Sequence, residues 1–294
     1  MTMTEARKAS AGSGAEWLLA GFSLLRRSPL GLGLLGAIFG LLSAVPMLFA
    51  ESNLGMFFAL QMLLVLLGPV LMGGFIHAVH EVESGRQAQP GHLLQGFREG
   101  KALRLVALLL PQVALGIVAV LLLVVMVGPA QLQEAIAVLE QVEGQANPDP
   151  ALFQELPVGA FLLWLLTVFV LGVVTYFFTF VATPQIMLEN RGAFASMKRS
   201  FRACLRNVPA MLVFFVLLII IAFLVSLGAQ LVAIIARVAA GPTAMQFVSQ
   251  LLLMAVLLPV MMGATYRAWK QLLPADGAGT GTTTAPPPSS GIEV

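Results

Sequence analysis

The sequence predicts an all-α polytopic membrane protein with six transmembrane helices, and three observations point to this class. Of its 294 residues, 59% are hydrophobic and only 10% are charged, whereas an average soluble domain has about 50% and 25%. Six runs without Asp, Glu, Lys or Arg are each long enough for the roughly 20 residues that a helix needs to cross a bilayer. The basic residues lie almost entirely between alternate runs. This composition excludes a soluble enzyme, a disordered chain and a disulfide-stapled secreted domain.

The transmembrane domain is expected to cover residues 16–272. Its six spans are expected at 29–50, 54–79, 105–128, 158–188, 208–236 and 244–267. Each run is continuously apolar rather than alternating, which indicates helices and not a transmembrane β-barrel. Only Arg237 and the Gly241-Pro242 pair separate the fifth span from the sixth. The N-terminus, 1–15, and the tail, 273–294, are expected to be disordered, since neither can bury a core.

The basic residues predict the orientation, because Lys and Arg stay on the cytoplasmic side of a membrane. With the N-terminus inside, Arg237 alone lies outside, and the other 15 of the 16 Lys and Arg residues lie in cytoplasmic segments. The first span follows a polar segment and continues for a full membrane thickness, so it is expected to be an uncleaved anchor. Both termini are therefore predicted to be cytoplasmic.

The external loop, 129–157, is the longest connection and carries five acidic residues and no basic ones. Its apolar residues recur at intervals of four, three and three from Leu132 to Val142, which predicts an amphipathic helix over residues 130–143. Gly144 is expected to end this helix. The loop is expected to rest as a cap on the outer ends of the spans, and a ligand-binding lid is the alternative.

Self-similarity within the sequence indicates three parallel repeats of two spans each. A Phe with a basic residue nearby precedes each odd span, at Phe22, Phe97 and Phe201. A proline recurs in each even span and is expected to kink it, at Pro69, Pro184 and Pro259. Two spans per unit keep every copy in the same orientation. The alternative is a chance match, since boundary Phe-Arg pairs and intramembrane prolines are each common.

The segments that precede the odd spans are predicted to be amphipathic helices in the cytoplasmic headgroup layer. Before the fifth span, Phe194, Met197 and Phe201 fall on one helical face and the basic residues on the others. The partner that this implies is the lipid bilayer, with anionic lipid at the cytoplasmic face. The residues expected to face lipid at this boundary are Trp17, Phe22, Arg26, Arg27, Phe97, Lys101, Phe194, Arg199, Phe201, Arg202 and Arg206.

Catalysis or coupled transport in a membrane usually requires an ionisable residue within the spans, and the span interiors contain none. His77, His80 and Glu81 lie together at the end of the second span but match neither His-Glu-x-x-His nor His-x-x-Glu-His. The sequence therefore predicts no catalytic residue, no metal site and no cofactor. Cys204 is the single cysteine and cannot form an internal disulfide, and a net charge of +2 does not indicate nucleic-acid binding.

Three boundary motifs carry a family resemblance: Trp17-Leu-Leu-Ala-Gly21-Phe22, Gly96-Phe97-Arg98 and Ser196-Met-Lys-Arg-Ser200-Phe201. Over about residues 15–272, the chain resembles an uncharacterised family of proteobacterial six-span inner-membrane proteins. More distantly, it is similar to the membrane domain found beside some glycerophosphodiester phosphodiesterases, although the phosphodiesterase residues are absent. The resemblance implies a topology and a location in the bacterial inner membrane, and it supplies no activity.

Three classes of function remain open. A non-enzymatic scaffold or partner-binding component fits the lack of a recognised site and is the class we favour. A channel or facilitator for a small solute fits kinked spans without ionisable groups. A membrane enzyme requires that His77, His80 and Glu81 converge.

Overall fold

The computed structural model describes residues 7–142, 145, 149 and 156–273, and every regular element in those residues is a helix. The expected tail from residue 274, residues 1–6 and Gly144 lie outside the described residues. In chain order, the α-helices are α1 (Ser13–Arg27), α2 (Pro29–Ala44), α3 (Leu54–Glu83), α4 (Gln95–Arg98), α5 (Ala102–Val106), α6 (Leu110–Met126), α7 (Pro129–Val142), α8 (Val158–Thr179), α9 (Ala182–Glu189), α10 (Ala193–Arg206) and α11 (Val208–Leu272). The 3-10 helices are η1 (Val45–Phe49), η2 (Pro90–Leu94) and η3 (Ala107–Leu109).

Within the described ranges, five helical stretches are long and apolar enough to cross a membrane. They are Pro29–Phe49, Leu54–Glu83, Ala102–Met126, Val158–Glu189 and Val208–Leu272. The last stretch is α11, whose 65 residues would extend about 98 Å as one straight helix, roughly three times the thickness of a bilayer core. The helix is interrupted at Gly241, where φ is 87° and ψ is −176°, a backbone conformation that glycine adopts far more readily than other residues.

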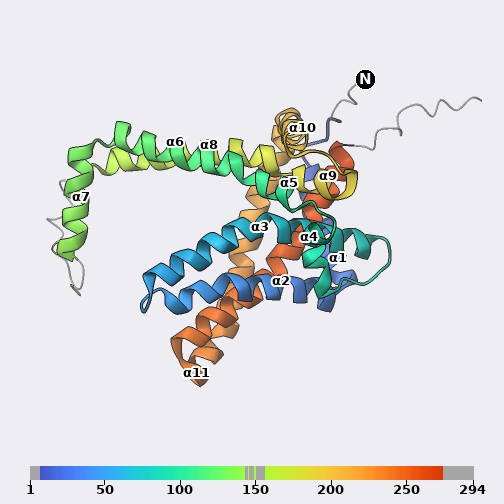
Figure 1. Cartoon of the computed structure of the whole chain (residues 1–294), viewed down its shortest axis with the longest axis horizontal. Helices are drawn as coiled ribbons and strands as arrows, with labels where there is room; N and C mark the ends of the chain where they lie inside the picture. The colour runs from blue at the N-terminus through green and yellow to red at the C-terminus, as the bar shows by residue number, and fades with distance from the viewer. Residues whose placement is uncertain (1–6, 143–144, 146–148, 150–155, 274–294) are drawn as a thin grey trace, which may run out of the picture.

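The chain of α11 reverses direction, as Figure 1 shows. Its first end and its last end are both bonded to the segment that precedes α1. The side-chain oxygen Oδ1 of Asn207 accepts the backbone N–H of Ala9 at 2.7 Å, and the carbonyl of Leu272 accepts the N–H of Arg7 at 3.0 Å. Since Arg7 and Ala9 are two residues apart, the two ends of α11 must lie close together.

Glycines allow α1 and α2 to pack directly on the backbone of α11. A Cβ added at Gly14 would lie 2.3 Å from the carbonyl oxygen of Ala210, and one added at Gly21 would lie 2.2 Å from that of Val260. Helix α1 therefore touches both limbs of α11 and holds them together. Gly36 of α2 packs in the same way on the second limb, and small residues at such crossings are usual in membrane proteins.

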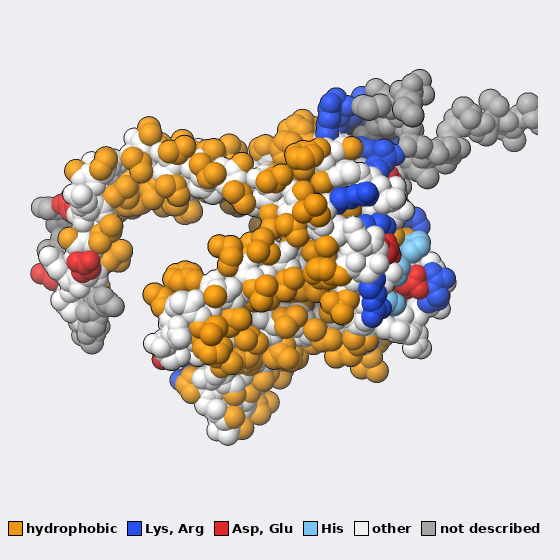
Figure 2. Space-filling view, in the orientation of Figure 1, with side chains coloured by type: hydrophobic (Ala, Val, Ile, Leu, Met, Phe, Trp, Pro, Cys, Tyr) orange, Lys and Arg blue, Asp and Glu red, His pale blue; other side chains and the backbone are white. Residues whose placement is uncertain are grey.

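Helices α6 and α8 form an arm that stands apart from α2, α3 and α11 (Figure 1). No residue of α6 is buried, and Phe177 is the only buried residue of α8. The indole N–H of Trp164 in α8 donates to the carbonyl of Ala119 in α6 at 2.9 Å and ties the two helices together. The exposed side chains of the arm are mostly apolar, as the space-filling view shows (Figure 2).

The expected loop helix over 130–143 is present as α7, whereas the fourth span is not a single helix. It breaks between α8 and α9, and the hydroxyl of Ser200 in α10 serves both sides of the break. This hydroxyl donates to the carbonyl of Phe177 at 2.7 Å and accepts from the N–H of Val181 at 3.2 Å. Pro184 lies three residues beyond Val181, in the first turn of α9.

Candidate functional site

Ionisable side chains gather at one end of the molecule, which is on the right in Figure 2. We call this region the charged end. It consists of α1, the end of α3, the segment between α3 and α5, helices α9 and α10, and the end of α11. Within it, hydrogen bonds and ion pairs join residues that are far apart in the sequence. Three nodes of contacts can be distinguished.

The first node joins the end of α3 to the end of α11. The carboxylate of Glu83 accepts the hydroxyl of Tyr266 at 2.6 Å and the ammonium of Lys270 at 2.7 Å. The same Tyr266 hydroxyl lies 2.9 Å from Nδ1 of His80. Tyr266 is almost completely buried, so this node fixes the second limb of α11 against α3.

The second node is the carboxylate of Glu189, the last residue of α9. It accepts the indole N–H of Trp269 at 2.8 Å and Nη1 of Arg199 at 2.9 Å, and it pairs with Arg191. A single carboxylate thus joins α9 to α10 and to the end of α11. Charge-assisted contacts of this kind are about twice as strong as hydrogen bonds between neutral groups.

The third node contains His77, Glu81, His92 and Glu99. Nε2 of His77 lies 3.9 Å from Glu81, its Nδ1 lies 4.0 Å from Glu99, and its ring meets that of His92 edge-on. Burial and the neighbouring His77 lower the pKa of His92, so His92 is neutral at pH 7. Among the described residues, no group of three or more His, Cys, Asp or Glu side chains is placed to hold a metal ion.

Glu99 shows how this node depends on charge. Burial alone would raise the pKa of its carboxyl, but hydrogen bonds from Lys101 at 2.6 Å and Gln95 at 2.8 Å outweigh burial and lower the pKa below its usual value. Lys101 also donates to the carbonyl of Met187 in α9 at 2.6 Å. The charged form of Glu99 therefore helps hold Lys101 in its contact with α9.

A pH titration tests this arrangement with the Glu99→Gln variant. Because the pKa of Glu99 is lowered in the folded protein, its contribution to stability is present above the unfolded pKa, about 4.3, and is lost as pH falls through the folded value. The wild type should lose more thermal stability than the variant between pH 7 and pH 3, by on the order of 0.2–1 kcal/mol. Equal losses of Tm in detergent would contradict this role.

Helix α10 lies at the boundary between the charged end and the arm. Its buried face consists of Ala193, Ser196, Met197, Ser200, Ala203 and Cys204. Phe194 is exposed, although the sequence placed it on one apolar face with Met197. The small residues let α10 pack closely on α8 and α9, so the larger apolar side chains project elsewhere. Figure 1 shows α10 nearly end-on while α6 and α8 lie lengthwise, so α10 runs across the arm.

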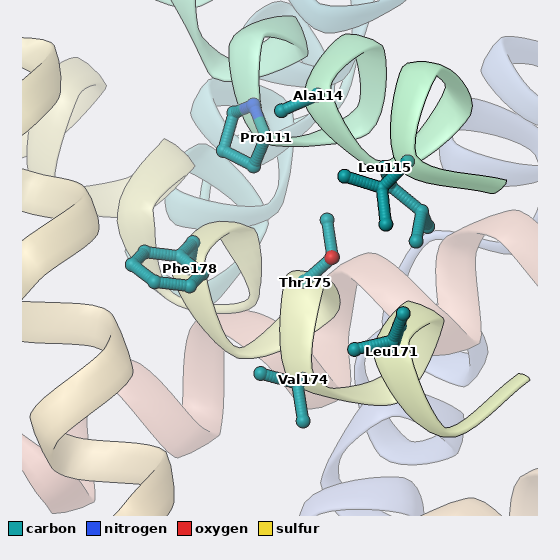
Figure 3. A pocket seen from close by; sticks show the side chains of 8 residues that line it. Pro111, Ala114, Leu115, Leu171, Val174, Thr175 and Phe178 are labelled. Carbon is teal, nitrogen blue, oxygen red and sulfur yellow. The ribbon is translucent and has the colours of Figure 1, made fainter. Parts of the chain in front are cut away.

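Two adjoining apolar grooves lie along the arm. The first, about 380 Å³, lies between α6 and α8, where Thr175 points toward α6 (Figure 3). The second, about 620 Å³, lies between the start of α6 and the exposed face of α10. Pro111 and Phe178 line both grooves, so the two lie next to each other. Lys198 and Arg202 of α10 also line the second groove.

The structure places Trp17 differently from the expectation that it faces lipid. Its side chain is completely buried, and its indole N–H donates to the side chain of Gln271 at 2.6 Å. The rings of Phe180 and Phe214 lie 6.0 Å and 6.2 Å from it. Trp17 therefore anchors α1 to the end of α11 instead of facing the bilayer.

The other expected boundary residues fall into two groups. Those exposed at the charged end are Arg26, Arg27, Phe97, Phe194, Arg202 and Arg206. Those partly buried in helix contacts are Phe22, Lys101, Arg199 and Phe201. Of the expected kink residues, Pro69 and Pro259 lie inside α3 and α11.

Sequence reasoning did not identify the residues that organise the nodes, chiefly Glu83, Glu189 and Tyr266. Their partners are distant in the chain, as with the 183 residues that separate Glu83 from Tyr266. A signal was present, since Tyr266 is one of only two tyrosines, and a buried tyrosine usually has a hydrogen-bond partner.

The helices and their contacts identify the class of protein. The chain has long apolar helices capable of crossing a membrane, and its ionisable nodes gather at one end. These are the features of a multi-pass helical membrane protein. The chain belongs to the family described as a domain of unknown function, DUF7847, which matches residues 16–272. This confirms that the chain belongs to an uncharacterised family, over nearly the residues expected. No curated protein and no solved structure matches the chain.

Proposed function

We propose that the protein is a non-enzymatic scaffold or partner-binding component of the bacterial inner membrane. The observation that carries this proposal is the engagement of the charged end in contacts between helices. Glu83 is bound by Lys270 and Glu189 by Arg199, and Lys101, which pairs with Glu99, also donates to the carbonyl of Met187 in α9. Carboxylates held in this way fix helices in place, which is a structural task.

The proposed topology has six spans with both termini in the cytoplasm. The reversal of α11 at Gly241 supports counting its two limbs as the fifth and sixth spans, since each limb is longer than the roughly 20 residues that a membrane span needs. The charged end holds most of the basic residues, which supports a cytoplasmic location for it. Arg237, the single outlier, lies four residues from the reversal and so would face outward.

We further propose three repeats related by a pseudo-threefold axis along the membrane normal, as residues 17–80, 92–188 and 194–270. The return helix of each unit packs on the segment that starts the next. A Cβ added at Gly74 of α3 would lie 2.3 Å from a carbonyl of η2, and Gln185 of α9 donates to a carbonyl of α10 at 3.3 Å. Gly263 of α11 packs on Gly21 of α1, which closes the cycle.

The bilayer itself is the proposed partner, with anionic lipid at the cytoplasmic face. Support comes from Arg26, Arg27 and Arg202, which are exposed at the charged end beside apolar helices. Each cation near an anionic membrane surface favours binding by about 1 kcal/mol. The proteobacterial origin and the distant likeness to phosphodiesterase-associated membrane domains rest on the three boundary motifs.

The enzyme alternative requires His77, His80 and Glu81 to act together. His77 does approach Glu81, but Nδ1 of His80 lies beside the hydroxyl of Tyr266. The three groups are thus divided between two nodes, and this division supports the non-enzymatic proposal.

Metabolite profiling tests the proposal in a deletion strain complemented with wild type or with a variant that combines His77→Ala and His80→Ala. We expect identical metabolite profiles and no stoichiometric zinc or iron in the purified wild type. Tyr266→Phe is the matched control, because it removes the hydrogen bond to His80 and keeps both histidines. A metabolite that accumulates in the double variant but not in the control would overturn the proposal, as would bound metal that the double variant loses.

A further inference from the structure

The two adjoining grooves on the arm together form a groove with apolar walls and a cationic mouth. The part between α6 and α8 is lined by Ala114, Leu115 and Val118 of α6 and by Leu171 and Val174 of α8, and Figure 3 shows that the two helices form its opposite walls. Thr175 is the one polar side chain in this part. A ligand portion that fills it must therefore be largely apolar and narrow enough to lie between two helices.

The mouth of the groove is formed by α10. Lys198 and Arg202 are four residues apart, so they lie on the same face of the helix, and both line the groove. Neither makes an ion pair within the described part of the chain, whereas Arg199 on another face of α10 pairs with Glu189. Among the residues that the structure describes, the groove therefore ends at two exposed positive charges that pair with no carboxylate.

This combination selects an amphiphile with an anionic head. A free phosphate would match the two cations and leave the apolar groove empty, and a neutral lipid would fill the groove and leave the cations unmatched. Helix α10 crosses the arm at the end where the charged groups begin (Figures 1 and 2), which is the depth of lipid headgroups in the proposed membrane topology.

We propose that this groove binds one anionic phospholipid, with an acyl chain between α6 and α8 and its phosphate at Lys198 and Arg202. The proposal rests on the membrane location of the proposed function and adds a defined site to it. The two grooves together fall in the size range of small-molecule sites. Guanidinium and ammonium groups are the usual protein partners of phosphate.

The test measures lipid retained by purified, detergent-solubilised protein, using phosphatidylglycerol and phosphatidylcholine as probes in native mass spectrometry. Wild type should retain one phosphatidylglycerol in preference to phosphatidylcholine. Combining Lys198→Ala with Arg202→Ala should weaken phosphatidylglycerol binding by about 30-fold. The matched control combines Arg26→Ala with Arg27→Ala, which removes the same charge from the same end and should change binding by less than about twofold.

A second variant tests the apolar part of the site. Ala114→Leu adds volume inside the groove and should weaken phosphatidylglycerol binding while Lys198 and Arg202 remain. Unchanged binding in this variant would overturn the proposal, as would thermal stabilisation by inorganic phosphate equal to that by the lipid. Phosphatidylglycerol binding could also weaken equally in the Lys198→Ala/Arg202→Ala variant and in the Arg26→Ala/Arg27→Ala control. That result would overturn the defined site and leave only a general attraction to anionic lipid. If neither the wild type nor any variant prefers phosphatidylglycerol to phosphatidylcholine, both the defined site and the general attraction to anionic lipid are contradicted.

Discussion

Replacing Gly21 by alanine is expected to destabilise the protein by about 2–3 kcal/mol, because the new methyl group has no room. Its Cβ would lie 2.2 Å from the carbonyl oxygen of Val260. That oxygen belongs to the backbone of α11 and cannot rotate away as a side chain can. Helices α1 and α11 would have to separate, and with them the contact that α1 makes with the first limb at Gly14. Thermal unfolding in detergent should show a Tm lower by roughly 4–10 °C.

The matched control for this prediction is Gly33→Ala. A Cβ at Gly33 would lie 3.6 Å from the carbonyl oxygen of Ala255, which is an ordinary contact. Alanine also favours a helix over glycine by about 1 kcal/mol. This variant should therefore be as stable as the wild type or slightly more stable. If both variants lower Tm equally, close packing at Gly21 is not what holds α1 on α11.

Replacing Glu189 by alanine is expected to cost about 2–4 kcal/mol, because one carboxylate serves three elements. The variant removes the acceptor of the Trp269 indole N–H and the carboxylate that Arg191 and Arg199 contact. The end of α9, the middle of α10 and the end of α11 should loosen together. Proteolysis of the solubilised variant should therefore accelerate near the charged end.

Glu16→Ala is the control for the carboxylate, because Glu16 is exposed on α1. Its replacement should change the free energy of unfolding by less than about 0.5 kcal/mol, and Tm should hardly move. Glu189→Gln should fall between the two variants, since its amide oxygen still accepts a hydrogen bond and its charge is gone. A Glu189→Ala variant as stable as Glu16→Ala would contradict the role of the second node.

The helical class follows from local composition, and so it could be predicted. A continuous apolar run of 20 or more residues can satisfy its backbone within a membrane only as a helix. The helical stretches Pro29–Phe49, Leu54–Glu83, Ala102–Met126 and Val158–Glu189 begin and end near the bounds predicted for the first four spans. The amphipathic helices α7 and α10 were recognisable for the same reason, since their periodicity is local. The break before α9 was not, because the hydroxyl of Ser200 stabilises it from another helix.

The charged end was predictable in location but not in connectivity. The basic residues indicated where it lies, yet their partners depend on how helices meet. Trp17 was expected at the lipid boundary because it falls on the apolar face of the amphipathic segment predicted before the first span. In the fold its partner is Gln271, 254 residues away, and no local pattern contains that contact. Packing of Gly21 on Val260 is equally nonlocal.

Thiol labelling of intact cells tests the six-span topology most directly. In a Cys204→Ala background, Gln141→Cys and Val238→Cys should react with a membrane-impermeant reagent. Arg98→Cys and Arg267→Cys should react only after the membrane is permeabilised. Val238 is 85% exposed and lies beside the reversal of α11, whereas Arg267 lies near its end. Labelling of the Arg267→Cys variant in intact cells would show that α11 crosses the membrane once and would contradict the account.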